Sequence, residues 1–265
     1  MKTNRFRQVR ATGQVPVGQM IWEFGSRGIA RMMEVCDLDF AIIDTEHAAF
    51  TSAELADLIA WFGGTTVAPF VRVPEIAYHL LARTMDAGAL GVMVPNVKTA
   101  AEARAIVDAT KYAPLGQRGI GLGGALTAYR TVEPAAFLEE SNANTTVICQ
   151  IESVEGLANL EAIAATPGVD ALWVGHFDLS QSMGIPGQFH DPRFLDNLRQ
   201  VVAVCAAHGL GAGIQPGTIE QGREWLALGF DVISYGTDMG AYMTATSGAV
   251  AAIRAETVKN GVRPS

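Results

Sequence analysis

Short apolar segments alternate with longer segments rich in Ala, Leu and Glu along the whole chain. Apolar segments with many β-branched residues are typical of strands, and apolar residues spaced three or four apart are typical of helices. The pattern predicts strands at 15–24, 40–44, 67–73, 91–95, 146–151, 171–174, 211–214 and 232–235. It predicts helices at 28–35, 52–62, 75–87, 99–111, 154–165, 192–208, 218–228 and 241–258.

Several predicted strands are near-continuous apolar runs, such as AIID at 41–44, VMVP at 92–95 and LWVG at 172–175. Strands that are covered on both faces have this composition, which favours a parallel sheet. Eight βα units in 265 residues match the size of a closed barrel, for which about 250 residues is typical. We therefore predict an α/β fold, a (β/α)8 TIM barrel that forms a single domain over 1–265. No Gly-x-Gly-x-x-Gly follows the first strand, which weighs against an open dinucleotide-binding sheet.

The segment 113–145 interrupts this regular alternation between the fourth and fifth strands. It is rich in glycine over 116–124 and carries Arg118 and Arg130. Glycine-rich loops can hold phosphate through backbone N–H groups, but scattered glycines are weak support for that. A mobile lid over an active site, or a contact between subunits, is the favoured interpretation.

Composition narrows the range of partners. The chain is 49% hydrophobic with a net charge of −8, and its mean hydropathy is +0.21. This predicts a large core and a buried subunit interface. An acidic balance without a Lys/Arg cluster argues against nucleic acid as a partner. No apolar run is long enough for a membrane span or a signal peptide, so we expect a cytoplasmic protein. The cysteines, Cys36, Cys149 and Cys205, are far apart and are expected to be buried thiols rather than zinc ligands or disulfides.

Polar side chains follow the predicted strands where a barrel enzyme carries its chemistry, at their C-terminal ends. Burying a charge costs several kcal/mol unless the charge is paired or bound to a metal. Charged residues at these strand ends are therefore expected to have a partner, a metal or a substrate. The candidates are Asp44, Glu46 and His47 after the second strand, Arg72 on the third, Gln150 and Glu152 on the fifth, and Asp178 after the sixth.

Glu152 and Asp178 are the candidate metal ligands. They end neighbouring predicted strands, so their side chains can converge. Two carboxylates with open positions suit an octahedral Mg²⁺ or Mn²⁺, whereas zinc prefers more His or Cys ligands than are nearby. The alternative is structural, with Glu152 capping the next helix and Asp178 holding a loop.

Arg72 and His47 are the candidate catalytic groups. The Arg72 guanidinium can stabilise an oxyanion or carboxylate, or form an ion pair with Asp44 or Glu46, and the two roles are compatible. His47 can act as a general base oriented by Asp44, or be an ordinary structural side chain. Gln150 points the same way as Glu152 by strand alternation, so its amide can bind a substrate oxygen.

Several segments together resemble the HpcH/HpaI aldolase family. The matching stretches cover most of the chain, and the D-x-E-H, Q-I-E and D-L-S motifs are specific in combination. They are AIIDTEHA at 41–48, FVRVP at 70–74, DAGALGVMVPNVKTAAEAR at 86–104, GQRGIG at 116–121, CQIESVEGLANLEAIAATPGVDALWVG at 149–175 and FDLSQSMGIPG at 177–187.

The resemblance implies a class II aldolase that cleaves 4-hydroxy-2-oxo acids to an aldehyde and pyruvate, or a related 2-oxo acid. It implies a divalent metal, Mg²⁺ or Mn²⁺ with Co²⁺ as a further candidate, and a hexamer built of dimers that exchange the last helix. It also implies roles for particular residues. Glu152 and Asp178 match the metal ligands, Arg72 the group on the keto oxygen, His47 and Asp44 a proton-relaying dyad, Gln150 a neighbour of pyruvate, and Gly175 and Phe177 the turn that holds its carboxylate.

One stretch departs from the family pattern. Gly175-His176-Phe177-Asp178 stands where Gly-Pro-Ala/Ser-Asp is common, so a bulky His-Phe pair replaces a small, stiff one beside the expected substrate carboxylate. His176 is either an additional ligand or proton donor, or an ordinary turn residue. A malyl-CoA-type lyase or an oxaloacetate decarboxylase uses related chemistry. A Schiff-base aldolase needs a buried lysine, for which Lys98 is the candidate near a strand end. A non-catalytic metabolite-binding barrel is the alternative outside enzymes.

Overall fold

The computed structural model describes residues 1–259. Its strands pair in parallel and in chain order, and β8 closes on β1, so the predicted (β/α)8 barrel is confirmed. The strands are β1 Val17–Ile21, β2 Phe40–Asp44, β3 Ala68–Arg72, β4 Gly91–Val94, β5 Thr146–Ile151, β6 Ala171–Val174, β7 Gly211–Ile214 and β8 Val232–Thr237.

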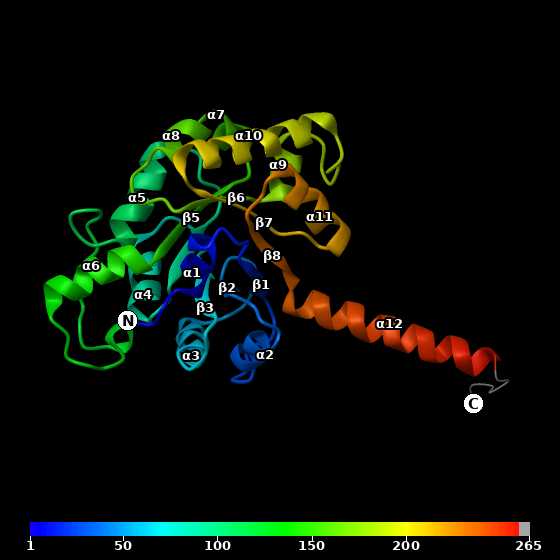
Figure 1. Ribbon diagram of the computed structural model, residues 1–265, viewed down its shortest axis with the longest axis horizontal. Helices are drawn as coiled ribbons and strands as arrows, with labels where there is room; N and C mark the ends of the chain where they lie inside the picture. Colours follow the sequence, from blue (N-terminus) through cyan, green and yellow to red (C-terminus); the bar gives the residue numbers. More distant parts are fainter. Residues whose placement is uncertain (260–265) are drawn as a thin grey trace.

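Most helices lie where the pattern predicts them, on the outside of the barrel (Figure 1). Those that match are α2 Ile29–Val35, α3 Ser52–Phe62, α4 Tyr78–Asp86, α5 Ala100–Thr110, α10 Pro192–His208 and α11 Ile219–Leu228. The predicted helix at 154–165 is divided at Asn159 into α7 Val154–Ala158 and α8 Leu160–Ala164, and the last helix, α12 Asp238–Lys259, begins earlier than expected. The pattern missed α1 Arg5–Ala11, α6 Pro134–Asn144, α9 His176–Ser182 and the 3₁₀ turn η1 Ala125–Thr127.

Inside the barrel, large aromatic side chains alternate with glycines on neighbouring strands. Phe70 is in register with Gly91, and Trp173 with Gly213. A Cβ on Gly91 would lie 2.8 Å from the Phe70 ring, and one on Gly213 would clash with the indole of Trp173. The glycines therefore make room for rings that fill the barrel interior at the density of a protein core.

Helix α1 closes the end of the barrel that lies at the N-termini of the strands. Phe6 is buried, with ring centroids 5.4 Å from Phe40 and 5.2 Å from Phe70 in edge-to-face geometry. This arrangement is favourable for aromatic rings. The basic N-terminal segment is thus part of the core structure.

Arginines of α1 hold acidic residues that precede three strands. Arg5 pairs with Asp39 at 2.7 Å, Arg7 with Asp170 at 2.7 Å, and Arg10 with Asp231 at 3.1 Å. Each of these aspartates also accepts a backbone N–H from the preceding strand or its start, as Asp39 does from Val17. The charges at this end of the barrel are therefore paired and hydrogen-bonded, which suits a structural rather than a catalytic role.

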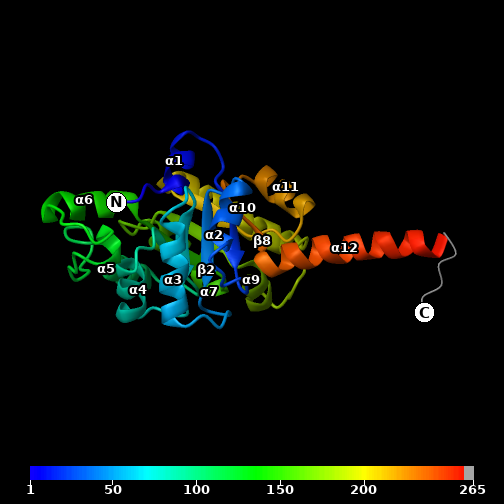
Figure 2. The same cartoon turned by 90° about the horizontal axis from the view of Figure 1, so that it is seen from below.

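Helix α12 leaves the barrel instead of packing against it. In Figures 1 and 2 it projects from β8 into open space, so the face of the barrel beside β1 and β8 lacks the helix that would normally cover it. The excursion between β4 and β5, which carries η1 and α6, lies on the opposite side of the barrel from α12 (Figure 2).

The cysteine prediction holds for two residues out of three. Cys149 and Cys205 are buried and free, and burial raises the pKa of each thiol to about 12. Cys36 is free but exposed, because it caps the C-terminal end of α2 at the surface. Within residues 1–259 no helix is long and apolar enough to cross a membrane.

We expect Phe6→Ala to lower the free energy of unfolding by about 3–5 kcal/mol, because it leaves a cavity between the Phe40 and Phe70 rings. Urea denaturation measures this change. Gln8→Ala, an exposed position of the same helix, is the control and should change stability by less than about 0.5 kcal/mol. A loss below about 1 kcal/mol for Phe6→Ala would mean that α1 does not close the core.

Candidate active site

Asp44 and Arg72 form a buried ion pair at the C-terminal ends of β2 and β3. They are register partners on adjacent strands. The Arg72 Nε and Nη2 atoms each donate to one Asp44 carboxylate oxygen at 2.8 Å, with Asp44 fully buried and Arg72 7% exposed. Burial acts to lower the pKa of Arg72, but Asp44 and Glu46 outweigh it and the pKa is raised. The guanidinium is therefore a fixed positive charge in the barrel mouth.

Glu46 extends this pair towards His47. The Glu46 Oε2 atom lies 3.1 Å from Arg72 Nη1 and 3.8 Å from His47 Nε2. Burial raises the pKa of Glu46, and the negative charges of Asp44 and Asp178 add to this rise. Arg72 and His47 partly offset it. A carboxyl group with a raised pKa beside an imidazole can exchange a proton closer to neutral pH.

The expected Asp44–His47 dyad takes a different form in the structure. Asp44 accepts the backbone N–H of Glu46 at 3.0 Å and that of His47 at 3.3 Å, while both its oxygens are bound by Arg72. The His47 imidazole is turned to Glu46 and packs edge-to-face on Trp22, with ring centroids 6.1 Å apart. Asp44 therefore fixes the backbone that carries His47, and Glu46 is the carboxylate next to its ring.

Glu152 is held in a cradle at the end of β5. One carboxylate oxygen accepts the Asn96 backbone N–H at 2.6 Å, and the other accepts the amide N–H of Gln150. A Cβ on Gly175 would collide with Glu152 Oε2, so this strand end needs glycine. The pKa of Glu152 is raised to about 7. Burial is the main cause, the hydrogen bonds from Gln150 and Asn96 oppose it, and the charges of Asp178 and Glu46 add to it.

Asp178 lies in the first turn of α9 and completes the acidic side of the mouth. Its negative charge contributes to the raised pKa of both Glu46 and Glu152, so the three carboxylates share one electrostatic environment. Among the described residues no group of three or more His, Cys, Asp or Glu is arranged to hold a metal ion. A dication here could be held by Glu152 and Asp178 with water or substrate oxygens, which is the arrangement that Mg²⁺ accepts.

The residues of this mouth all fall within one family profile. The profile of the HpcH/HpaI aldolase/citrate lyase family matches residues 20–245, a range that contains every mouth residue described above. The protein belongs to the HpcH/HpaI aldolase/citrate lyase family.

Members of the family resemble this chain over almost all of its length. A 5-keto-4-deoxy-D-glucarate aldolase of Shigella dysenteriae is 32% identical over 244 residues, which cover 92% of this chain and 94% of that protein. The crystal structure of an HpcH/HpaI aldolase from Desulfitobacterium hafniense superimposes with a TM-score of 0.89 at 30% identity, covering 94% of this chain and 96% of that one. That of citrate synthase SbnG gives 0.85 at 28% identity, covering 95% and 98%. This HpcH/HpaI protein is accordingly a carbon–carbon lyase of the class II aldolase type, a class that generally depends on a divalent metal.

His176 and Phe177, where the chain departs from the family motif, belong to an aromatic cluster. The His176 ring centroid lies 4.6 Å from Phe177, 5.0 Å from Phe189 and 5.1 Å from Trp225. Burial lowers the pKa of His176 to about 4, so the imidazole is neutral at physiological pH. This packing accounts for His176 as a core side chain, whereas Phe177 is 64% exposed.

Two residues of this HpcH/HpaI site escaped sequence analysis. Asn96 follows β4 with a positive φ of 52° and directs its N–H at Glu152. Asp238 is buried at the start of α12 and accepts the N–H groups of Trp22 and Phe24 at 3.0 and 2.7 Å, which holds the loop after β1. Asp238 directly follows β8, and a polar residue at a strand end was the criterion for a site residue. The predicted strand ended at residue 235, so Asp238 did not meet this criterion.

We expect Asp44→Ala to destabilise the protein by about 3–5 kcal/mol, because it leaves the Arg72 guanidinium buried without its main partner. Chemical denaturation of Asp44→Ala, Arg72→Ala and the double variant measures the coupling between them. The double variant should lose less stability than the sum of the two single variants. Asp196→Ala, which breaks the exposed pair with Arg199, is the control at about 0–1 kcal/mol. Additive effects of the Asp44 and Arg72 changes would contradict the ion pair's role.

Proposed function

We propose that this enzyme makes and breaks the bond between the third and fourth carbons of 4-hydroxy-2-oxo acids, by way of the enolate of pyruvate or a related 2-oxo acid. The observation that supports it most directly is the Arg72 guanidinium, fixed by Asp44 in a mouth that also holds the Glu152 cradle. Arg72 uses Nε and Nη2 on Asp44 and retains further N–H donors for a substrate oxygen. Removal of a proton beside a keto group leaves negative charge on that oxygen, which such a donor stabilises.

Glu152 and Asp178 are the residues that we propose hold the dication, with Mg²⁺ or Mn²⁺ as the first candidates and Co²⁺ as a further one. Their hard carboxylate oxygens suit these ions. The buried Glu152 carboxyl, whose pKa is raised to about 7, accepts hydrogen bonds from two neutral groups, the Asn96 N–H and the Gln150 amide, and a bound dication would stabilise its charged form directly. When bound, the metal acts as a Lewis acid on the oxygens of the 2-oxo acid.

Other groups in the mouth are placed to bind and orient the substrate. The Gln150 Oε1 atom is buried and has no hydrogen-bond partner among the described residues, so it can accept from a hydroxyl group or water. The N–H groups of His176, Phe177 and Asp178 open the first turn of α9 and have no carbonyl partner within the helix. We assign the substrate carboxylate to this turn, beside Gly175.

Glu46 and His47 are the groups that we propose exchange the proton. The His47 side chain is half exposed, and its Nε2 atom lies 3.8 Å from Glu46 Oε2. In the direction of bond formation, either atom can take the proton from the carbon next to the keto group, and the oxygen of the incoming aldehyde gains a proton to become the 4-hydroxyl group. In cleavage, the 4-hydroxyl group loses its proton and the same carbon regains one. Asp44 keeps Arg72 and the His47 backbone in place during this transfer.

A Schiff-base mechanism has less support from the lysines. Lys111 is buried and burial lowers its pKa, as that mechanism needs, but its Nζ lies 3.6 Å from Asp170, which precedes β6. It therefore sits at the end of the barrel opposite to the mouth, next to α1. Catalysis through Arg72 and two carboxylates accounts better for the residues in the mouth.

We expect the enzyme to exchange the methyl protons of pyruvate with deuterium in D₂O when a dication is added, as followed by proton NMR. Glu152→Gln and Gly175→Ala should both reduce this exchange, since the first removes a ligand charge and the second displaces the carboxylate. Arg72→Lys should slow it by about 10²–10³-fold, because a lysine does not reproduce the guanidinium geometry.

Arg199→Lys, a change of an exposed arginine on α10, is the matched control and should leave exchange unaltered. Exchange that persists with a chelator present, or that is unaffected by Arg72→Lys, would remove the proposed mechanism. A screen of aldehydes as acceptors then identifies the second substrate.

We also propose a homo-oligomer, a hexamer built of dimers, in which α12 packs on the barrel of a partner. Helices α2 and α11 flank the face of the barrel that α12 leaves uncovered (Figure 1). The exposed apolar side chains of these three helices are Met32 and Val35 on α2, Ile219 and Leu226 on α11, and Tyr242, Met243, Val250 and Ile253 on α12. Burying these apolar side chains between subunits is favourable.

The free cysteines fit a reducing compartment, and we propose that the protein acts in the cytoplasm. We also propose that residues 1–265 form one domain.

We expect the double variant Val250→Asp/Ile253→Asp to dissociate this oligomer, because it places charges in an apolar interface. Size-exclusion chromatography with light scattering measures the mass of the particles. The control is Gln200→Asp, at an exposed position of α10. An unchanged mass for the double variant would exclude α12 from the interface.

A further inference from the structure

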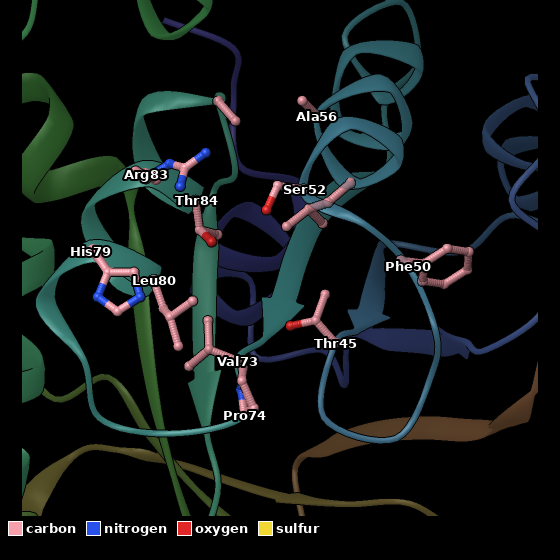
Figure 3. A pocket seen from close by; sticks show the side chains of 12 residues that line it. Thr45, Phe50, Ser52, Ala56, Val73, Pro74, His79, Leu80, Arg83 and Thr84 are labelled. Atoms are coloured by element: carbon pink, nitrogen blue, oxygen red, sulfur yellow. The ribbon is translucent and has the colours of Figure 1, made fainter.

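A cavity of about 340 Å³ lies outside the barrel, between α3 and α4 (Figure 3). Cavities that hold small ligands typically have volumes of about 300–1,000 Å³. One wall is the face of α3 formed by Ser52, Leu55 and Ala56, and the other is the face of α4 that includes Leu80, Arg83 and Thr84. The mouth residues Glu152 and Asp178 do not line it, so it is distinct from the catalytic site.

The walls of this cavity combine positive charge with apolar surface and contain no acidic side chain. His79 and Arg83 are one helical turn apart on α4, so they lie on the same face of the helix. Among the described residues the Arg83 guanidinium has no ion pair or hydrogen bond of its own. In a chain with a net charge of −8, a cavity that is lined by the Arg83 guanidinium and lacks carboxylates selects an anion.

The remaining lining residues indicate the rest of the ligand. Val73 and Leu80 give an apolar floor, and Phe50 and Leu55 add further apolar surface to the lining. Ser52 and Thr84 contribute hydroxyl groups, and Thr84 lies between Arg83 and Val73 (Figure 3). A fully hydrated ion such as inorganic phosphate gains nothing from the floor, and a neutral apolar molecule leaves Arg83 unused. The lining matches an anionic head on a short apolar chain.

The back of the cavity lies next to the catalytic strand ends at Thr45 and Val73. These residues directly follow Asp44 and Arg72, and both line the cavity. The Thr45 hydroxyl donates to the Arg72 carbonyl oxygen at 2.7 Å, and the Thr45 N–H donates to the same oxygen at 2.9 Å. A molecule that presses on Thr45 therefore acts on the backbone that carries the Asp44–Arg72 pair.

We propose that this cavity is a binding site for a small organic carboxylate with a short apolar chain, and that its occupation modulates the catalytic site through Thr45. The carboxylate pairs with Arg83 and the chain lies between Leu55 and Leu80. The binding part is independent of the reaction assigned to the barrel mouth, whereas the modulation rests on the proposed function.

Binding is tested by isothermal titration of the intact protein with hexanoate, in parallel with 1-hexanol and inorganic phosphate. Hexanoate should bind, and Arg83→Gln should weaken it by about tenfold or more, the value of one charge-assisted hydrogen bond. The matched control, Arg199→Gln on the surface of α10, should bind hexanoate as the unchanged protein does. Equal binding of hexanol and hexanoate, or equal affinity of Arg83→Gln and the unchanged protein, would overturn the site. So would binding that is abolished by pyruvate, which would locate hexanoate in the barrel mouth.

Modulation is tested by the rate of pyruvate methyl exchange with and without saturating hexanoate. The rate should change at least twofold in the unchanged protein and in Thr45→Ser, which keeps the hydroxyl group. It should not change in Arg83→Gln, whose exchange without hexanoate should be normal. Hexanoate that binds at Arg83 and leaves the exchange rate unaltered would overturn the coupling. Absence of exchange in every sample would count against the proposed function alone, because the titration reports binding separately.

Discussion

The buried pair of Asp44 and Arg72 is the interaction on which the catalytic end of this barrel depends. A guanidinium at 7% exposure cannot give up its charge, so its position requires a carboxylate that is equally buried and correctly oriented. Adjacent parallel strands provide this, because β2 and β3 end in register at these residues. The same carboxylate accepts the N–H groups of Glu46 and His47, so one side chain sets both the cation and the loop that faces it.

The two ends of the barrel treat charge in opposite ways. At the N-terminal ends of the strands, the arginines of α1 form ion pairs with the aspartates that precede β2, β6 and β8, and each of these carboxylates also accepts a backbone N–H. At the C-terminal ends, burial and the charge of Asp178 raise the pKa of Glu46 and of Glu152. Excess negative charge that is enclosed and only partly compensated is unfavourable for folding, and it is typical of a site that receives a cation or a proton. The division separates stability from chemistry, as the barrel fold generally does.

Two features of the molecular surface lie outside the mouth. Beside β1 and β8 the last helix projects away from the barrel, and this helix, α12, carries exposed apolar side chains such as Tyr242, Met243 and Ile253. The cavity between α3 and α4 reaches the back of the same strand ends that carry Asp44 and Arg72. Both features adjoin barrel strands directly. Helix α12 begins at the residue after β8, and the cavity lining includes Thr45 and Val73, which follow Asp44 and Arg72.

The sequence by itself determined the barrel, because strands buried on both faces must be apolar throughout and their spacing leaves room for one helix each. It also determined Asp44, Arg72, Gln150 and Glu152 as residues of the mouth, since a polar side chain at the end of an apolar strand is costly to bury unless a partner or ligand meets it there. Helices α1 and α9 were not predictable, because both are short and their apolar residues pack on distant segments rather than on a periodic face. Only the tertiary structure decided that Glu46 rather than Asp44 adjoins the His47 ring, that Asn96 and Asp238 serve the site, and that His176 is a core side chain. Those outcomes depend on the rotation of side chains and on neighbours far away in the chain, and no local pattern encodes either.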